Sequence, residues 1–226
     1  MNFIITAGPT REYLDPVRFL SNPSTGKMGF AIARAAVRRG HRAVIIAGPV
    51  ALKTPSRVKR IDVVSAREMF AAVKHSLSSE KGECVFVAAA AVADWRPMKC
   101  ARRKLKKTQM SSVVKLVRNP DILKQVSGCM KVGFAAETDN MLAEAHRKCR
   151  EKGLAFIVAN DVTRHGCGFG TDTNCVCLVR PDGSCQMLKM MSKLSVATRI
   201  VREIESLYRT SQDTTLKRRR GRSEND

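Results

Sequence analysis

Several groups of residues that could do chemistry directly follow short apolar runs. This is where ligands are expected, since ligands of α/β proteins bind beyond the ends of strands. The first group is Ser21–Gly29, which places small residues, hydroxyl groups and two glycines directly before a helix-length segment. Backbone amides in such a loop approach a phosphate closely, and the helix N-terminus adds positive partial charge. The candidates for phosphate binding are Ser24, Gly26, Lys27 and Gly29. The segment matches neither the Walker A nor the Gly-x-Gly-x-x-Gly pattern, so an ordinary strand-to-helix loop stays open as an alternative.

A second group ends a buried strand with very small side chains and then presents an acid. Ala88, Ala89 and Ala90 allow a flat ring or a ribose to lie against the backbone, and Asp94 follows at the expected ligand edge of the sheet. The alternative is a tightly packed strand followed by a helix-capping or salt-bridged aspartate.

The third group is basic. Arg96–Lys107 contains seven basic residues, no acidic residue and no hydrophobic period. A loop that closes over a triphosphate has this composition, since lysines there neutralise charge on a leaving group. A solvated surface loop or an RNA-contacting loop has it too, although the aromatic residues needed for base stacking are missing.

Polar residues follow two further apolar runs, in Lys131–Thr138 and Ala159–Val162. Their side chains would meet Asp94 in one crevice, or else serve as turn and cap residues. Gly166–Gly170 reads as a flexible loop in which Cys167 is an incidental thiol rather than a nucleophile.

The eight cysteines do not indicate a metal centre or a disulfide framework. They include no Cys-x-x-Cys pair, and Cys175 and Cys177 lie in an alternating, strand-like run. The N-terminus has no signal peptide, and no apolar run is long enough to cross a membrane, so we expect a cytoplasmic protein with reduced thiols. We assign no protein metal ligands.

The elements that position these groups follow from apolar runs alternating with helix-length segments. This order predicts an α/β fold with a Rossmann-like, doubly wound, mostly parallel sheet. A turn at Pro181–Ser184 predicts a C-terminal antiparallel hairpin. The predicted strands are 3–7, 43–47, 61–64, 84–91, 132–136, 156–160, 175–179 and 186–190. The predicted helices are 26–39, 65–77, 141–152 and 192–208.

A formal net charge of +21 favours anionic partners without choosing among nucleic acid, membrane surface and phosphorylated substrate. The last residues, 209–226, are polar, with six basic and three acidic residues, and lack apolar periodicity, so we expect a disordered tail after a domain at 1–208. A solvated terminus is favoured there over a nucleic-acid-binding arm.

Taken in order, eight motifs closely resemble phosphopantothenoylcysteine synthetases, from residue 3 to about 208. They are Ile5–Glu12, Asp15–Arg18, Ser21–Asn22 with Gly26–Gly29, Ala90–Asp94, Lys104–Lys107, Asn119–Leu123, Val132–Thr138 and Ala159–Val162. The resemblance implies a ligase of coenzyme A biosynthesis that joins L-cysteine to 4'-phosphopantothenate through an acyl-cytidylate. It also implies consumption of CTP with Mg²⁺ and a homodimer whose pocket is completed across the interface. The flavin-dependent half found in many relatives is not in this sequence, so no flavin is expected.

The same resemblance implies roles for individual residues. Asn22 matches the residue that processes the acyl-nucleotide, Arg18 lies beside it, and Lys104 is the main cation of the basic loop. The positions that match nucleotide-contacting residues are Ala88, Ala89, Ala90, Asp94, Lys104, Lys131, Val132, Gly133, Phe134, Lys148 and Lys152.

Two other classes of function remain as alternatives. The charge and the Lys217–Arg222 run suggest a non-catalytic nucleic-acid-binding protein, which would show steeply salt-dependent binding. A nicotinamide-dependent oxidoreductase would share the sheet architecture, but the missing Gly-x-Gly-x-x-Gly pattern argues against it.

Overall fold

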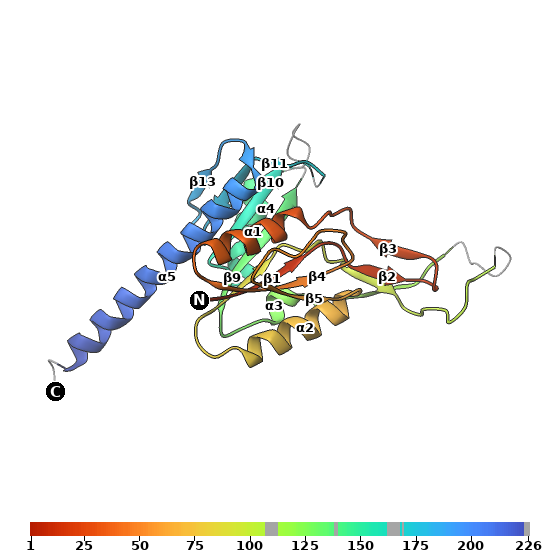
Figure 1. The fold of residues 1–226 in the computed structure, drawn as a ribbon, viewed down its shortest axis with the longest axis horizontal. Helices are drawn as coiled ribbons and strands as arrows, with labels where there is room; N and C mark the ends of the chain where they lie inside the picture. The colour runs from red at the N-terminus through yellow and green to blue at the C-terminus, as the bar shows by residue number, and fades with distance from the viewer. Residues whose placement is uncertain (107–112, 138–139, 162–167, 169, 224–226) are drawn as a thin grey trace.

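The structure is a computed structural model that describes residues 1–106, 113–137, 140–161, 168 and 170–223. Its body is one eight-stranded sheet (Figure 1). From one edge to the other, the strands are β13 (Cys185–Met187), β12 (Val176–Val179), β10 (Phe156–Asp161), β9 (Met130–Glu137), β6 (Cys84–Ala88), β1 (Asn2–Ala7), β4 (Arg42–Ala47) and β5 (Val58–Asp62). The strands from β10 to β5 pair in parallel, and β12 and β13 pair antiparallel. The predicted α/β class, parallel sheet and C-terminal hairpin are confirmed.

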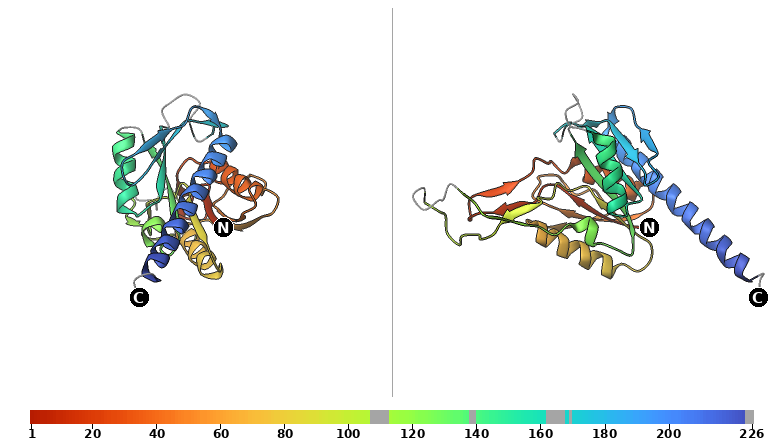
Figure 2. Two further views of the ribbon diagram at one scale, coloured as in Figure 1. Left: turned by 90° about the vertical axis from the view of Figure 1, so that its left-hand side faces the viewer. Right: turned by 180° about the vertical axis from the view of Figure 1, so that it is seen from behind.

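Helices cover both faces of the sheet (Figure 2). One face packs against α1 (Lys27–Arg38) and α5 (Lys193–Ser223). The other packs against α2 (Ala66–Ser79), the short α3 (Ile122–Gln125) and α4 (Met141–Glu151). Successive side chains of a strand point to opposite faces, so Phe3 and Ile5 join the first layer and Ile4 joins the second. Burial on both faces explains why these strands are continuous apolar runs.

The start of α2 follows the sequence pattern closely. Ser65 Oγ accepts a hydrogen bond from the Glu68 amide at 3.2 Å, and Glu68 Oε2 accepts one from the Val64 amide at 2.9 Å. The predicted capping box is therefore present. It fixes the point at which the chain leaves β5 and enters the helix.

The last helix is longer than predicted. We expected it to end at Tyr208, but α5 continues to Ser223 and extends away from the body (Figure 1). We expected a tail without regular structure over 209–226, whereas the structure has helix over 209–223, where Leu, Lys and Arg are good helix formers. A division of function at residue 208 stays a prediction. Within the described ranges, no helix combines the length and apolar character needed to cross a bilayer.

Two short ribbons project from the body and were not predicted. They are β2 (Arg11–Tyr13) with β3 (Phe19–Ser21), and β7 (Trp95–Pro97) with β8 (Leu116–Arg118). We call these ribbons and the described residues between their strands the arm, which lies at the right in Figure 1. A further small pair, β11 (Thr173–Asn174) with β14 (Met191–Ser192), precedes α5.

A charged cluster joins α5 to the end of α1. Glu205 Oε1 accepts a hydrogen bond from Arg39 Nε at 2.8 Å, and Glu205 Oε2 accepts one from Arg39 Nη2 at 2.6 Å. His41 Nε2 lies 2.8 Å from Glu205 Oε1. The Arg39 guanidinium lowers the pKa of Glu205, against an opposing effect of burial and with further help from His41. The cluster therefore stabilises the fold when Glu205 is ionised.

We expect Glu205→Gln to lower the free energy of unfolding by about 2 kcal/mol near neutral pH, because it removes a nearly buried, charge-assisted acceptor. The folded pKa lies below the ordinary value of 4.5, so this stabilisation is complete above that pH and is lost as the pH falls through the folded value. Urea unfolding of both proteins at neutral and acidic pH measures the difference. A gap that stays constant on acidification contradicts the assignment.

Candidate functional site

Two adjoining cavities open at the carboxyl ends of the central parallel strands. The loop cavity has a volume of about 480 Å³ and lies beside the start of α1. The strand-end cavity has a volume of about 470 Å³ and lies beside α3. Both are lined by Ala90, Val92, Asp94 and Phe134, so these residues form a shared wall. Each volume is in the range of small-molecule sites.

The start of α1 forms one side of the loop cavity. Gly26 precedes the helix with a left-handed φ of 76°, and Ser24 Oγ accepts a hydrogen bond from its amide at 3.3 Å. Among the residues that the structure describes, no side chain caps the first turn, whose amides are the unpaired donors of a helix N-terminus. Asn22, Ser24 and Lys27 line the same cavity. The arrangement favours an anion at this helix end.

The small-residue run after β6 is held by the neighbouring strand β1 and the loop that follows it. The Ala90 amide donates to Thr6 Oγ1 at 3.4 Å, and the Ala93 amide donates to Thr10 Oγ1 at 3.0 Å. The backbone is thereby fixed where the side chains are too small to fill space. This explains how an alanine run forms the wall of a cavity rather than a packed core.

Asp94 lies at the junction of the two cavities and is exposed. Its carbonyl accepts a hydrogen bond from the Asn119 amide at 2.8 Å, and Asn119 Nδ2 donates to the Ala93 carbonyl at 2.8 Å. Asn119 thus fixes the backbone carbonyls of Ala93 and Asp94, and with them the position of Asp94. Within the described ranges no ion pair of Asp94 is observed, and the residue lines both cavities.

The structure brings most of the predicted site residues to this crevice. Those that line the loop cavity are Asn22, Ser24, Gly26, Lys27, Ala89, Ala90, Asp94, Phe134 and Lys148. Those that line the strand-end cavity are Ala88, Ala90, Asp94, Phe134 and Lys152. Asn160, at the end of β10, also lines the loop cavity. Several predicted residues lie elsewhere: Arg18, Gly29, Lys104, Lys131, Val132 and Gly133 line neither cavity.

The predicted residues at the start of β9 support the site from behind. Lys131 Nζ donates to the carbonyls of Leu123, at 3.1 Å, and Lys152, at 2.5 Å. Val132 is fully buried, and a Cβ on Gly133 would lie 2.7 Å from the Leu154 side chain. Lys131 therefore fixes the backbone of Leu123 and Lys152, which line the strand-end cavity. Its contact with a nucleotide stays a prediction.

Sequence reasoning missed the role of α3 in the strand-end cavity. Asp121 and Leu123 line this cavity, and Asp121 Oδ2 lies 2.9 Å from Lys152 Nζ. Burial opposes ionisation of Asp121, but the Lys152 ammonium and the Lys124 amide outweigh it and lower the pKa. The Asn119–Leu123 motif was a signal that these residues mattered, but only the fold shows that they face Phe134.

The other missed residues lie on the far side of the loop cavity. Asn174 and Lys193 line it, and both are nearly buried. Lys27 Nζ donates to Gly170 O at 2.9 Å and to Asp172 Oδ1 at 2.8 Å, in the segment just before Asn174.

Four residues named in the sequence analysis lie outside the described residues: Lys107, Thr138, Val162 and Cys167.

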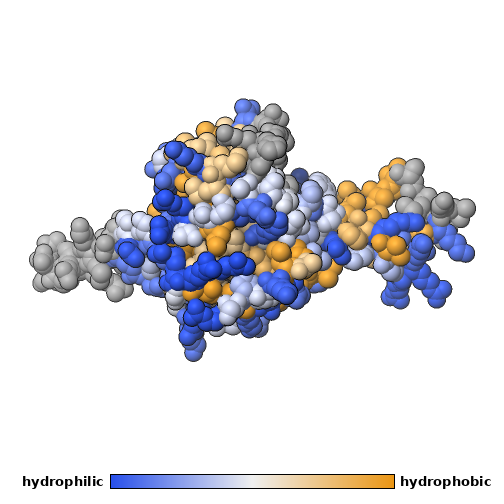
Figure 3. All heavy atoms as spheres, turned by 45° about the horizontal axis from the view of Figure 1, so that its top comes forward, coloured by the Kyte–Doolittle hydropathy of each residue, from blue (hydrophilic) through white to orange (hydrophobic). Residues whose placement is uncertain are grey.

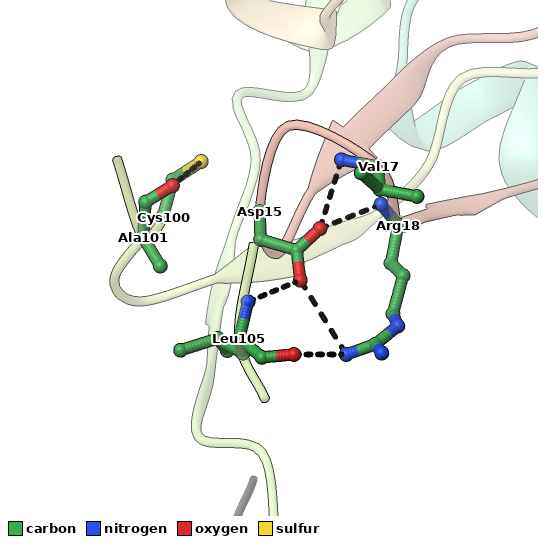
Figure 4. Close-up of polar contacts among 6 residues, drawn as sticks. All are labelled: Asp15, Val17, Arg18, Cys100, Ala101 and Leu105. Atoms are coloured by element: carbon green, nitrogen blue, oxygen red, sulfur yellow. Dashed lines mark hydrogen bonds and ion pairs between the residues drawn. The ribbon is translucent and has the colours of Figure 1, made fainter. Parts of the chain in front are cut away.

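Arg18 and Lys104 belong to the outer part of the arm. Asp15 has a fully inaccessible side chain that accepts hydrogen bonds from the amides of Val17, Arg18 and Leu105 (Figure 4). Arg18 Nη1 lies 3.4 Å from both Asp15 Oδ2 and the Leu105 carbonyl. Burial alone raises the pKa of Asp15, but the three amides and the Arg18 guanidinium outweigh it, and the net pKa is lowered. The exposed Lys104 is thus attached to a fixed turn.

The chain matches the family model of the DNA/pantothenate metabolism flavoprotein C-terminal domain over residues 1–208. It is 43% identical over 213 residues to the coenzyme A biosynthesis bifunctional protein CoaBC of Vibrio vulnificus, covering 91% of this chain and 52% of that protein. It is 45% identical over 216 residues to CoaBC of Escherichia coli K12, covering 92% and 52%. The chain therefore spans about half the length of these curated relatives.

A solved structure is also similar. The crystal structure of the C-terminal domain of a coenzyme A biosynthesis bifunctional protein CoaBC matches with a TM-score of 0.77 and 38% identity. The match covers 92% of this chain and 96% of that domain. The fold described above is therefore that of a known domain of these bifunctional proteins.

We expect Asp15→Asn to loosen the turn that carries Lys104. The new amide group would place a donor against Leu105 N, which now donates to Asp15 Oδ2 at 3.2 Å. Hydrogen exchange of the Leu105 amide should become several-fold faster, and trypsin should cleave sooner after Arg102 or Arg103.

The matched control is Asp182→Asn, which alters a similar acceptor in the β12–β13 turn, where the Ser184 amide donates to Asp182 Oδ1 at 2.9 Å. It should leave Leu105 exchange unchanged. Equal exchange at Leu105 in wild type and Asp15→Asn would show that Asp15 does not hold this turn.

Proposed function

Because the chain belongs to the family of DNA/pantothenate metabolism flavoprotein C-terminal domains, we propose that it is a phosphopantothenate–cysteine ligase of coenzyme A biosynthesis. It joins L-cysteine to 4'-phosphopantothenate, consumes CTP, and releases CMP and pyrophosphate. We assign this activity to residues 1–208 and no part of it to the basic tail. The relatives named above are coenzyme A biosynthesis proteins, which supports this assignment.

The observation that carries the proposal is the pair of cavities with a shared wall. A ligase of this type must hold a nucleotide and an acid side by side, with the α-phosphorus next to the carboxylate. Ala90 and Asp94 lie at the junction of the two cavities, where such a meeting would take place. The start of α1 supplies amides for phosphates on one side, and Lys152 supplies a cation on the other.

In the first step, a carboxylate oxygen of phosphopantothenate attacks the α-phosphorus of CTP. The bond between that phosphorus and the oxygen that bridges the α- and β-phosphates breaks, and pyrophosphate leaves with the electron pair. This step requires neutralisation of phosphate charge more than it requires a protein nucleophile. The cations that line the loop cavity, Lys27 and Lys148, suit that task.

Magnesium enters with CTP as part of the substrate, because Mg²⁺ is held mainly by phosphates and water with one or two carboxylates. The described residues contain no group of three or more His, Cys, Asp or Glu arranged as a metal site. The exposed Asp94 is the carboxylate at the junction of the cavities. A single carboxylate of this kind fits a substrate-borne Mg²⁺ rather than a resident ion.

In the second step, the amine of cysteine attacks the acyl carbon, an amide bond forms, and CMP leaves. Asn22 Nδ2 donates to the Val92 carbonyl at 3.2 Å, which holds the amide group at the cavity wall. The carboxamide has a second N–H and an oxygen that can bind the acyl-cytidylate. We assign Asn22 to the orientation of this intermediate.

The direct test is to incubate the protein with phosphopantothenate, L-cysteine, Mg²⁺ and CTP. We expect pyrophosphate, CMP and phosphopantothenoylcysteine in equal amounts. Omission of cysteine should limit pyrophosphate release to about one per site, since the acyl-cytidylate then accumulates. Absence of product with CTP and also with ATP would overturn the proposal.

We further propose that the protein acts as a homodimer in which the arm of one copy completes the site of the other. Arg18 and Lys104 line neither cavity of their own chain. Most of the exposed large apolar side chains of the described residues lie on the arm, where Figure 3 shows an apolar area at the right. They include Val17, Trp95 and Met98, which are 56%, 45% and 50% exposed. An apolar area of this kind is typical of an interface.

This arrangement predicts complementation between two inactive variants. Asn22→Asp damages the cavity, and Lys104→Gln removes the arm cation. A mixed dimer would contain one site with both changes and one site with neither. Random pairing of equal amounts should therefore restore about a quarter of wild-type turnover, once subunits have exchanged.

The control mixes Lys104→Gln with Arg18→Gln, which both alter the arm and should not complement each other. Recovery in neither mixture, with exchange verified by differently tagged subunits, would show that each site uses its own arm.

A further inference from the structure

Lys193 is a nearly buried lysine in the loop cavity to which the sequence analysis assigned no function. It is the first residue of α5, it is 7% exposed, and it lines the cavity. Its Nζ lies 3.3 Å from the Gly168 carbonyl, and its backbone amide donates to the Asp172 carbonyl at 2.9 Å. Lysines are rarely buried to this degree, because the ammonium loses hydration that only a counter-charge or hydrogen bonds can replace.

A second ammonium converges on the same short segment from another helix. Lys27, in the first turn of α1, donates to the Gly170 carbonyl and to the carboxylate of Asp172. Burial and then the charge of Lys27 lower the pKa of Lys193, while Asp172 raises it. The Asp172 side chain is 89% exposed, so water weakens its effect on both lysines.

The two lysines share the loop cavity with the start of α1. The helix end adds partial positive charge and amide donors without a side-chain cap. The shared wall, formed by Ala90, Val92, Asp94 and Phe134, offers no positive charge, and its one ionisable side chain is the carboxylate of Asp94. Lys27 and Lys193 line the loop cavity and not the strand-end cavity, so both ammonium groups lie on the same side of the shared wall.

We infer that Lys193 binds the polyphosphate of the nucleoside triphosphate and, with Lys27, holds the two phosphates that leave as pyrophosphate. This inference rests on the proposed function and adds to it a residue and a place for the leaving group. When the bond between the α-phosphorus and the bridging oxygen breaks, the electron pair stays on pyrophosphate. The two ammonium groups stabilise that charge, and no proton needs to move.

The variant Lys193→Met keeps a long apolar stem and removes the charge. We expect its affinity for pyrophosphate and for CTP, measured by calorimetry with Mg²⁺, to fall about 10- to 100-fold, as for loss of a charge-assisted contact. Its affinity for CMP should change less than about twofold, because CMP lacks the two phosphates concerned. The thermal unfolding midpoint should stay close to that of wild type.

Lys189→Met is the matched control. It removes the same charge from an exposed position four residues earlier, so it tests for a general electrostatic effect. It should bind pyrophosphate, CTP and CMP as wild type does. Equal losses in Lys189→Met and Lys193→Met would overturn the inference.

Three other results would also overturn it: pyrophosphate fails to bind wild type, Lys193→Met binds CTP as wild type does, or its affinities for CMP and CTP fall equally. The last result would mean that Lys193 only supports the cavity wall. The proposed function fails separately, if wild type forms no phosphopantothenoylcysteine. A Lys193-dependent pyrophosphate site in a protein without ligase activity would uphold this inference and refute that function.

Discussion

The close approach of backbone segments at the end of β1 is the constraint on which the site depends. A Cβ on Gly29 would lie 2.5 Å from the Ala7 Cβ, so α1 rests directly on the strand. A Cβ on Gly48 would lie 1.8 Å from the Pro9 carbonyl oxygen, so the end of β4 is equally close. The Ala91 amide donates to Gly8 O at 2.9 Å and joins the end of β6 to the same point. Three strand ends and one helix start are therefore fixed together without side chains between them.

This packing has an electrostatic consequence. The loops that meet there are rich in glycine and alanine, and backbone carbonyls anchor two of the lysines around the site. Lys131 binds the carbonyls of Leu123 and Lys152, and Lys193 lies against that of Gly168. Lysines held in this way keep their positions in the absence of a ligand, which in the proposed reaction would reduce the reorganisation needed as phosphate charge develops. Part of the net charge of +21 therefore lies at the cavities, on Lys27, Lys148, Lys152 and Lys193.

The sequence predicted the body of the fold better than its periphery, for physical reasons. Strands such as β1 and β10 are buried on both faces and therefore appear as unbroken apolar runs. The arm strands have three residues each and are largely exposed, so no period distinguishes them from loops. Residues such as Asp121 and Lys193 reach the cavities only through long-range packing, which a local pattern does not encode. The extension of α5 was missed because a polar helix without an apolar face resembles a disordered tail.

In the proposed dimer, the arm would separate tasks that a single cavity would otherwise combine. Asn22 and Lys27 lie on the body, where strand ends and α1 fix them, whereas Lys104 lies on a projecting turn held by Asp15. The turn is rigid at its base, since one buried carboxylate binds three amides, yet Lys104 itself is exposed. In the proposed dimer, a cation carried in this way would reach the site of the partner, while the binding groups of the body stay fixed. Recognition of the phosphates and closure over them would then be controlled by different parts of the molecule, and in a dimer by different subunits.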